Sequence, residues 1–518
     1  MRLALISVSL FLAFAFSILT SAQKPKPVSY TKEIQPLLNK RCVICHNDKV
    51  ASDDVRLDSY EEIIKGDKKG PLVVAGKSSE SRLFLVVAGK KEPKMPPPPL
   101  PPLTPSELNL LRRWIDEGAK NDADAAKPIQ PAKRKPIDKT AKISSPKPQQ
   151  VKVQLEGNQE VNVEFGPVPT LSAIAFATDG KTLFVGGYKE VVLWDLSEAK
   201  MSGRWSMDKL DGNITAMAVS PNGTFVAVSI GNPQKPATVA ILDAKTGKVL
   251  QQFTEPKDLV YSLAISPDGK WLAAACSDKL VYVWNLSEGK LASTLKEHGD
   301  WALGVAFNAN GNFLATSSID RIVRIWEVGS WKVIRKMEHP EPTYRLAFQP
   351  NGNLLAVAMG GESSKGVWIW NAENGQKVRT LGGVKEPVLD VAWSADGKWV
   401  IAAAADNTVR LYDSNGNLKA TLQGHKDWVN AVAFHPDNLR FASASNDGTV
   451  RLWHIEGRPL AVLLQLQVGK DEWLIITHYG YFASTKVQEK LETRGEQWRN
   501  HEMVKRAIAG EKLKPAQK

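Results

Sequence analysis

A repeat with a period of about 42 residues constrains the fold of this chain more than any other feature. In each unit a run rich in Val, Ile and Leu ends at a marker residue that follows an apolar or aromatic one. The seven markers are Asp195, Asp243, Asn285, Glu327, Asn371, Asp413 and His454. Most units also carry an upstream turn, such as Ser266-Pro267-Asp268-Gly269. Self-similarity at this spacing indicates seven repeating structural units.

Tryptophan and histidine positions repeat together with the markers. The units with a Trp directly before the marker carry Trp194, Trp284, Trp326, Trp370 and Trp453. Two units also share a His and an Asp, with separations of 22 and 6 residues in both, as His298, Asp320 and Trp326 and as His425, Asp447 and Trp453. This pattern resembles the WD40 repeat family, which implies an all-β propeller of seven blades, with about four short strands per blade.

The WD40 resemblance also implies a role for these His and Asp residues. In that family such residues, with Thr316 and Ser443 here, form a hydrogen-bonded network that braces the blade. A single His-Asp pair would suggest catalysis, but repetition at the blade period favours architecture. We therefore predict a structural role for them and assign no catalytic residue.

The N-terminal part carries the most informative chemical motif, Cys42-Val43-Ile44-Cys45-His46. The Cys42 and Cys45 thiols can form thioether links to a haem, and His46 then lies beneath the iron as its axial ligand. A local zinc site needs about four ligands, and the third cysteine of the chain, Cys276, lies in the repeat region. A thioredoxin-like site would follow a strand, whereas a helix is expected before Cys42. The motif therefore predicts one covalent haem c.

Two helices are expected around this motif. Ile34, Leu37 and Leu38 have helical spacing before Cys42. Farther on, Thr104-Pro105-Ser106-Glu107 predicts a capping box, and the helix that it starts should end at Gly118. Two helices that flank a haem are the outline of a small all-α class I cytochrome c.

The sixth iron ligand is predicted to be Met95. Between residues 23 and 200, Met95 is the only methionine and His46 the only histidine. The prolines after Met95 hold its loop extended, which favours a presented axial ligand over a methionine in a disordered linker. Ligation by His46 and Met95 closes both axial positions and so favours electron transfer over substrate binding at the iron.

The N-terminal region resembles the planctomycete-type cytochrome c domain. The residues that carry the resemblance are Tyr30, Ile34, Pro36-Leu37-Leu38, Cys42, Cys45-His46, Arg56-Leu57-Asp58, Gly76-Lys77, Ser81, Leu83, Met95-Pro96-Pro97 and Trp114-Ile115 with Gly118-Ala119. One departure is Tyr60-Glu61-Glu62-Ile63-Ile64-Lys65-Gly66, which replaces a Gly-rich stretch beside the haem. The family implies fusion to propellers and other extracellular modules.

The remaining segments complete the expected organisation. Residues 1–22 read as a signal peptide, with an uncleaved membrane anchor as the alternative. The other expected segments are a cytochrome c domain at 23–120, a Pro- and Lys-rich linker at 121–150, the propeller at 151–480 and a charged C-terminal tail at 481–518. Export fits the haem prediction, because c-type haem is attached outside the bacterial cytoplasm, and it places the protein in the periplasm or outside the cell.

These observations favour an exported c-type cytochrome that carries single electrons, with the propeller as a platform for protein docking. The formal net charge of +12 comes partly from flanking segments, so we expect no nucleic-acid partner, and a membrane partner only if the signal segment stays. The redox partner protein cannot be read from the residues. Two alternatives remain open: a haem-relay subunit or oxidoreductase whose propeller binds a substrate or second cofactor, and a haem-containing sensor or scaffold.

Overall fold

The computed structural model describes residues 27–43, 46, 55–67, 70–91, 95, 102–121, 149–154, 160–165, 170–360, 366–384, 386–485 and 500–513. The chain separates into two compact units, one N-terminal and one that contains the repeats. The expected signal segment, Cys45 and most of the expected linker lie outside the described residues. Among the residues described, the structure contains no helix long and apolar enough to cross a membrane.

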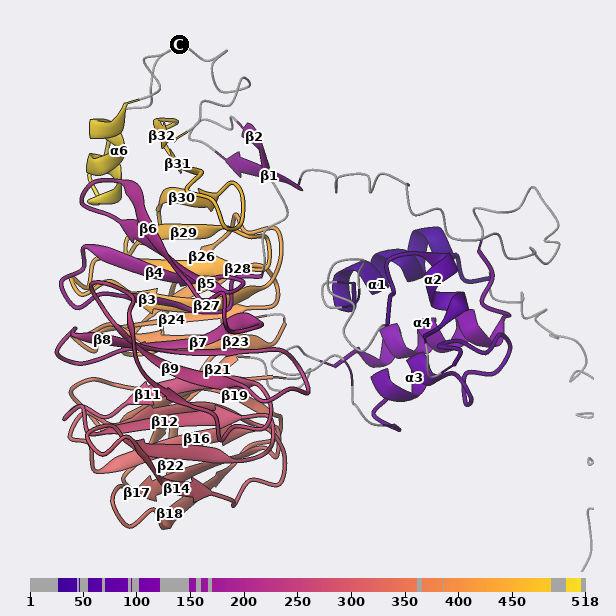
Figure 1. Ribbon diagram of the computed structural model, residues 1–518, viewed down its shortest axis with the longest axis horizontal. Helices are drawn as coiled ribbons and strands as arrows, with labels where there is room; N and C mark the ends of the chain where they lie inside the picture. Colours follow the sequence, from indigo (N-terminus) through magenta and orange to yellow (C-terminus); the bar gives the residue numbers. More distant parts are fainter. Residues whose placement is uncertain are drawn as a thin grey trace, which may run out of the picture. The chain divides into compact units, whose positions relative to one another are not determined.

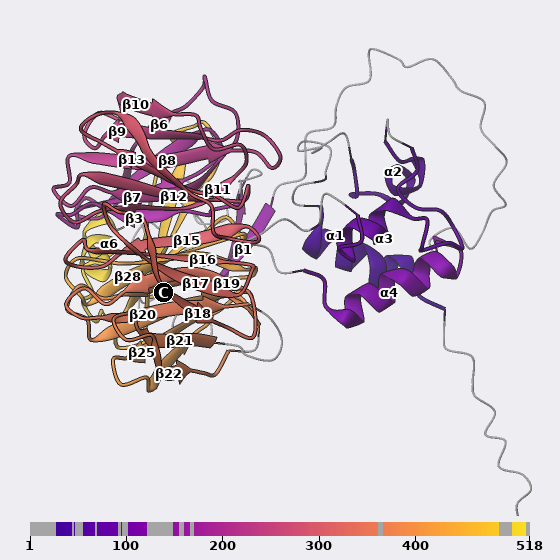
Figure 2. The same ribbon diagram turned by 90° about the horizontal axis from the view of Figure 1, so that it is seen from below.

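The N-terminal unit is helical (Figures 1 and 2). Its elements are a π-helical turn, η1 (Tyr30–Ile34), and the helices α1 (Gln35–Arg41), α2 (Tyr60–Lys65), α3 (Arg82–Val87) and α4 (Pro105–Asp116). One apolar cluster joins them, and its largest fully buried side chains are Ile34, Leu38, Ile63, Leu111, Trp114 and Ile115. These short helices by themselves do not establish a class I cytochrome c fold.

Local signals explain where these helices start and end. Pro36 lies in the first turn of α1, where its missing N–H costs no helical hydrogen bond. The capping box predicted for α4 is confirmed, since Thr104 and Glu107 each accept a hydrogen bond from the other's backbone N–H. The segment that departs from the family pattern forms α2, capped by the Ser59 hydroxyl. Gly66 ends it at a φ of +76°, where a Cβ would lie 2.4 Å from the Gly70 carbonyl oxygen.

The second unit is a seven-bladed β-propeller, as predicted, and each blade is an antiparallel sheet in which consecutive strands pair. Blade 1 contains β3 (Ile174–Phe176), β4 (Thr182–Gly186), β5 (Glu190–Asp195) and β6 (Lys200–Ser206). Blade 2 contains β7 (Asn213–Val219), β8 (Phe225–Gly231), β9 (Thr238–Asp243) and β10 (Val249–Phe253). Blade 3 contains β11 (Val260–Ile265), β12 (Trp271–Cys276), β13 (Val281–Asn285) and β14 (Lys290–Leu295). The first strands of successive blades contact one another around the ring, including β3 with β7 and β7 with β11.

Blades 4 to 6 repeat the same four-stranded plan. Blade 4 contains β15 (Ala302–Phe307), β16 (Phe313–Ser318), β17 (Ile322–Glu327) and β18 (Val333–Glu338). Blade 5 contains β19 (Thr343–Phe348), β20 (Leu354–Met359), β21 (Gly366–Asn371) and β22 (Gln376–Leu381). Blade 6 contains β23 (Val388–Trp393), β24 (Trp399–Ala404), β25 (Val409–Asp413) and β26 (Leu418–Leu422). Every marker residue of the sequence repeat is the last residue of the third strand of its blade. The 42-residue period is therefore the length of one blade.

Blade 7 is larger than the others. Its sheet has six strands, β27 (Val429–Phe434), β28 (Arg440–Ser445), β29 (Val450–His454), β30 (Pro459–Gln465), β31 (Trp473–Thr477) and β32 (Phe482–Ser484). The sheet therefore continues past residue 480, where we expected the propeller to end. A separate two-stranded sheet, β1 (Gln149–Gln154) with β2 (Glu160–Phe165), precedes blade 1.

The ring closes through contacts between blades 7 and 1. Strand β27 contacts β3, and the side-chain amide of Gln465 donates to a Glu190 carboxylate oxygen at 2.9 Å. Helix α6 (His501–Ile508) lies beside β30, β31 and β32 (Figure 1). Its Val504 and Ile508 are fully buried in one cluster with Trp194 of blade 1 and Trp473 of blade 7. Part of the segment expected to be a charged tail thus packs on the propeller core, because α6 has an apolar face.

Candidate functional site

Helix α1 positions the first cysteine of the predicted haem motif. Cys42 is the C-cap residue of α1, its backbone N–H donates to the Leu38 carbonyl oxygen, and only 7% of the residue is exposed. The His46 N–H donates to the Cys42 carbonyl oxygen at 3.1 Å, so His46 lies one turn farther along the chain. Cys45 falls outside the described residues. The structure therefore brings together Cys42 and His46, two of the predicted haem-binding residues.

The His46 side chain is oriented by the backbone of the following segment. Its Nδ1 lies 3.3 Å from the Val55 carbonyl oxygen, and the residue is 8% exposed. The carbonyl oxygen only accepts, so this contact favours a proton on Nδ1, and in the neutral ring Nε2 is then the nitrogen that can bind a metal. A backbone carbonyl at Nδ1 is the usual orienting partner of a metal-ligating histidine.

Met95 lies at the apolar cluster that also contains Cys42. Its backbone N–H donates to the Val86 carbonyl oxygen at 3.1 Å, which attaches it to the end of α3. The three groups match what a c-type haem needs: a thiol for covalent attachment, and an imidazole and a thioether as iron ligands. Apolar side chains surround the thiol and the thioether. These residue types therefore fit a haem, whose porphyrin supplies the equatorial nitrogens. The described part of the chain contains no group of three or more His, Cys, Asp and Glu that could hold a metal ion.

Sequence reasoning missed two features around this site. The first is an ion pair between Arg41 and Glu107, which are 66 residues apart. The second is a contact of three aromatic rings, in which Tyr30 lies 5.1 Å from Tyr60 and 5.5 Å from Trp114 between ring centroids. Burial and nearby acidic groups raise the pKa of Tyr30 to about 12. Periodic spacing in a sequence reports only on residues that are close along the chain. Neither of these contacts could therefore be predicted from the sequence pattern.

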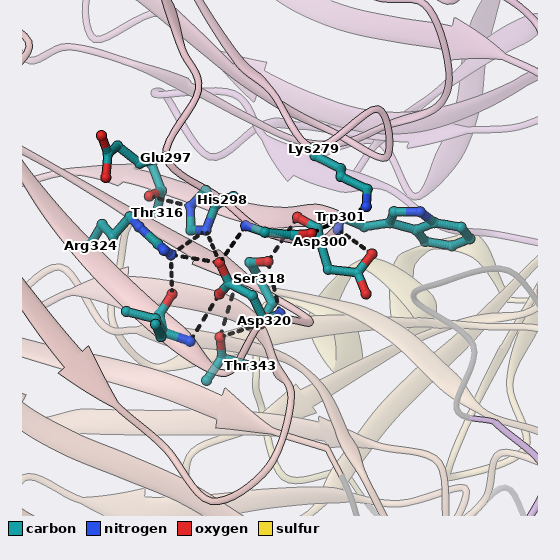
Figure 3. Close-up of polar contacts among 12 residues, drawn as sticks. Lys279, Glu297, His298, Asp300, Trp301, Thr316, Ser318, Asp320, Arg324 and Thr343 are labelled. Atoms are coloured by element: carbon teal, nitrogen blue, oxygen red, sulfur yellow. Dashed lines mark hydrogen bonds and ion pairs between the residues drawn. The ribbon is translucent and has the colours of Figure 1, made fainter. Parts of the chain in front are cut away.

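In blade 4 the network predicted from the WD40 resemblance is confirmed (Figure 3). His298 Nδ1 lies 3.1 Å from an Asp320 carboxylate oxygen, and its Nε2 lies 2.8 Å from the Thr316 hydroxyl. The Trp326 indole N–H donates to the same hydroxyl at 2.9 Å. Arg324 also binds Asp320, at 2.7 Å. Both ring nitrogens of His298, the Thr316 hydroxyl and the Trp326 indole N–H therefore have partners inside the blade.

In blade 7 the equivalent residues have the connectivity of a catalytic triad. His425 Nδ1 lies 3.1 Å from an Asp447 oxygen, and Nε2 lies 2.8 Å from the Ser443 hydroxyl. Burial would raise the pKa of Asp447, but the facing His425 lowers it below its ordinary value, while burial lowers the pKa of His425. Ser443 is 0% exposed and also accepts the Trp453 indole N–H at 2.8 Å. Substrate cannot reach this hydroxyl, so the network is structural.

The comparisons with known proteins match both units. Residues 42–99 match the planctomycete cytochrome C family. The segments that match the WD domain, G-beta repeat family are 247–285, 289–327, 375–413 and 416–454. The cytochrome match points to haem as the cofactor of the N-terminal unit.

Curated relatives resemble the chain over a limited part of its length. Protein groucho of Drosophila melanogaster is 26% identical over 46% of this chain and 32% of its own length. The WD repeat-containing protein WDS homolog of Arabidopsis thaliana is 24% identical over 47% of this chain and 46% of its own. An uncharacterized WD repeat-containing protein of Synechocystis is 28% identical over 38% of this chain and 43% of its own. The chain thus spans less than half of each relative. Together, the family matches and the fold show that this chain joins a helical unit, which matches the planctomycete cytochrome C family over residues 42–99, to a seven-bladed propeller that contains WD40 repeats.

Proposed function

We propose that this chain is an exported c-type cytochrome that carries single electrons and uses its propeller to dock another protein. The observation that carries the proposal is the pairing of the Cys42–His46 motif with the planctomycete cytochrome match, which begins at the first cysteine of that motif. A haem bound by thioethers and by His and Met supplies one-electron transfer at its iron.

Four side chains would hold one haem. Cys42 and Cys45 would attach it covalently, and His46 and Met95 would be the axial ligands. The Val55 carbonyl keeps the His46 ring in the orientation and tautomer that a metal ligand needs. The apolar cluster that includes Cys42 keeps water away from the cofactor edge. In this proposal α1 and α4 take the places of the two flanking helices of a class I cytochrome c.

The propeller contributes a rigid surface. WD40 propellers generally mediate protein–protein interaction, and the buried networks of blades 4 and 7 hold their loops in place. The proposed partner is a redox protein that docks there. Residues 1–22 would direct export to the periplasm or beyond, where haem attachment takes place.

The function is tested with the full chain produced together with a c-type haem maturation system. We expect a pyridine haemochrome spectrum of a covalent c-type haem, one haem per chain, and a reversible one-electron titration. The Cys42→Ala/Cys45→Ala variant should lose the covalent haem, and Met95→Ala should lose the Met-to-iron charge-transfer band. A matured wild-type protein without covalent haem would overturn the proposal. An unchanged spectrum in Met95→Ala would place the sixth ligand elsewhere.

Export and docking need separate measurements. Fractionation of cells that express the full chain should place it in the periplasm or medium, with an N-terminus near residue 23. Cytoplasmic retention of the whole chain would contradict export. A redox partner identified in that compartment should exchange electrons with the full chain faster than with the N-terminal unit alone, if the propeller docks it. Equal rates would remove the docking role.

A further inference from the structure

We propose that the Arg41–Glu107 ion pair is a positioning device that holds the two axial-ligand segments together and keeps Met95 bound to the iron. The proposal deepens the haem function above and rests on it. Neither residue belongs to the predicted haem-binding set, and the two act through the chain segments that they join.

The pair has the geometry of a bidentate contact. Arg41 Nε donates to Glu107 Oε1 at 3.0 Å, and Arg41 Nη2 donates to Glu107 Oε2 at 2.8 Å. The side chain of Arg41 is 5% exposed and that of Glu107 is 19% exposed. Two parallel charge-assisted hydrogen bonds in a partly dehydrated site fix both distance and orientation, unlike a single ammonium contact.

Each residue of the ion pair lies close in sequence to one of the two proposed axial ligands, His46 and Met95. Arg41 is the last residue of α1 and directly precedes Cys42, which is four residues before His46. Glu107 lies in the first turn of α4, and its Oε2 also accepts the Thr104 backbone N–H at 2.8 Å. Thr104, the N-cap residue of α4, follows Met95 by nine residues in the sequence. One carboxylate therefore joins the end of α1, which precedes His46, to the start of α4, which follows Met95.

Among the described residues, Met95 is held by a backbone hydrogen bond to Val86 and by packing of its side chain against the apolar cluster. Without the Glu107 charge, the Arg41 cation stays buried with a weaker partner, and α1 and the start of α4 can separate. In the proposed haem-bound state, a small displacement of Met95 would break its bond to the iron, because that bond has a specific geometry.

The test uses the full haem-loaded chain and compares Glu107→Gln and Arg41→Lys with Glu117→Gln. Glu117 also lies at α4 and also pairs with an arginine, Arg113, at 3.1 Å, but near the other end of the helix. We measure covalent haem content, the Met-to-iron charge-transfer band, the reduction potential and imidazole affinity. Imidazole competes with Met95, so its apparent affinity follows the fraction of protein whose Met95 is detached.

We expect wild-type haem content in all three variants. In Glu107→Gln and Arg41→Lys the charge-transfer band should weaken, the potential should fall, and imidazole should bind about tenfold more tightly. Glu117→Gln should match the wild type in all measurements. The swapped variant Arg41→Glu/Glu107→Arg should recover part of the band, since it restores an ion pair.

Several results would overturn the positioning role. One is a normal band and wild-type imidazole affinity in haem-loaded Glu107→Gln and Arg41→Lys. Another is loss of both haem and helical circular dichroism in both variants, which would show a role in folding alone. An equal effect in Glu117→Gln would show a general loss of stability of α4. A wild-type chain that never acquires haem would overturn the proposed function itself, and this outcome is distinguishable because it appears without any mutation.

Discussion

The N-terminal unit and the propeller differ in how they acquire stability. The propeller repeats one four-stranded sheet, and its inner strands are buried on both faces, as in β12 and β13. The N-terminal unit has helices of 6, 6, 7 and 12 residues around one apolar cluster. Helices this short are marginal alone and depend on tertiary contacts. The comparison shows that one unit is stabilised by repetition of the same sheet and the other by a single apolar cluster.

The histidines show the same difference at the level of single residues. In His298 and His425 both ring nitrogens face protein side chains, an Asp at Nδ1 and a Thr or Ser at Nε2. In His46 the described partner of Nδ1 is the backbone carbonyl of Val55 and not a side chain. The partners of a histidine, more than its presence, therefore distinguish a brace from a candidate ligand.

The largest expected effect is on the N-terminal unit when haem attachment is prevented. The Cys42→Ala/Cys45→Ala variant should lose amide protection across α1–α4 and keep it across blades 1–7, because the proposed haem would pack in the first unit alone. Hydrogen exchange followed by peptide mass spectrometry measures both units in the same sample. The control is Cys276→Ala, whose cysteine is buried in β12. Equal protection of α1–α4 with and without haem would remove the contrast between the units.

The next effect concerns the closure of the ring. Ile508→Ala should cost about 2–5 kcal/mol of propeller stability, because a fully buried side chain leaves a cavity between α6 and blades 7 and 1. Leu250→Ala, at a residue that is 56% exposed on β10, is the matched control and should change stability by less than about 0.5 kcal/mol. Chemical denaturation of the full chain, read out by propeller tryptophan fluorescence, gives both values. Similar losses in the two variants would mean that α6 is not part of the closure.

A smaller effect is a pH dependence that belongs to blade 5. His339 Nδ1 donates to the Met337 carbonyl and Nε2 accepts the Trp370 indole N–H at 2.9 Å, so the neutral ring satisfies both groups. Burial lowers the pKa of His339 from 6.5 to about 4. The unfolded chain therefore binds the proton more readily, and this contribution, at most about 3 kcal/mol, is present above pH 6.5 and is lost as the pH falls toward 4.

The measurement is the unfolding free energy between pH 4 and 7 for the wild type and for His339→Gln, whose amide can make both bonds without titrating. The difference between the two proteins should shrink or change sign as the pH falls. A constant difference across this range would show that the pKa of His339 is the same in the folded and unfolded states.

The smallest effect is expected in the blade 4 network. Thr316→Val keeps the shape of the side chain and removes the acceptor of the Trp326 indole N–H, so it should cost about 1–3 kcal/mol. Thr421→Val, on the exposed face of β26, should stay within about 0.5 kcal/mol. Thermal unfolding of the two variants compares them directly. If Thr316→Val is neutral, the network is a consequence of the blade fold and does not stabilise it.

Local patterns predicted the parts of the molecule that depend on neighbours in sequence. The seven markers identified the third strand of every blade, and the Thr104-Glu107 capping box identified the start of α4. The packing of α6 was missed, although Asn500 as N-cap with Val504 and Ile508 at helical spacing was a usable signal. Its basic residues, Lys505 and Arg506, made the segment resemble a solvated tail. The apolar face of α6 consists of only three buried residues, so its helical pattern was a weaker signal in the sequence than the basic residues beside it.

The candidate site also combines features that local sequence predicts with contacts that only the folded chain creates. The sequence by itself determined the period and the blade number, because strand periodicity and turns are local properties. It also predicted the haem-binding residues from the Cys42–His46 spacing, and these stay a prediction. Only the tertiary structure decided that Glu107 pairs with Arg41, that Val55 orients His46 and that α6 joins blade 7 to blade 1. These contacts join residues far apart along the chain or depend on how a loop folds back. Their energies come from burial and bidentate geometry, which exist only once the chain has folded.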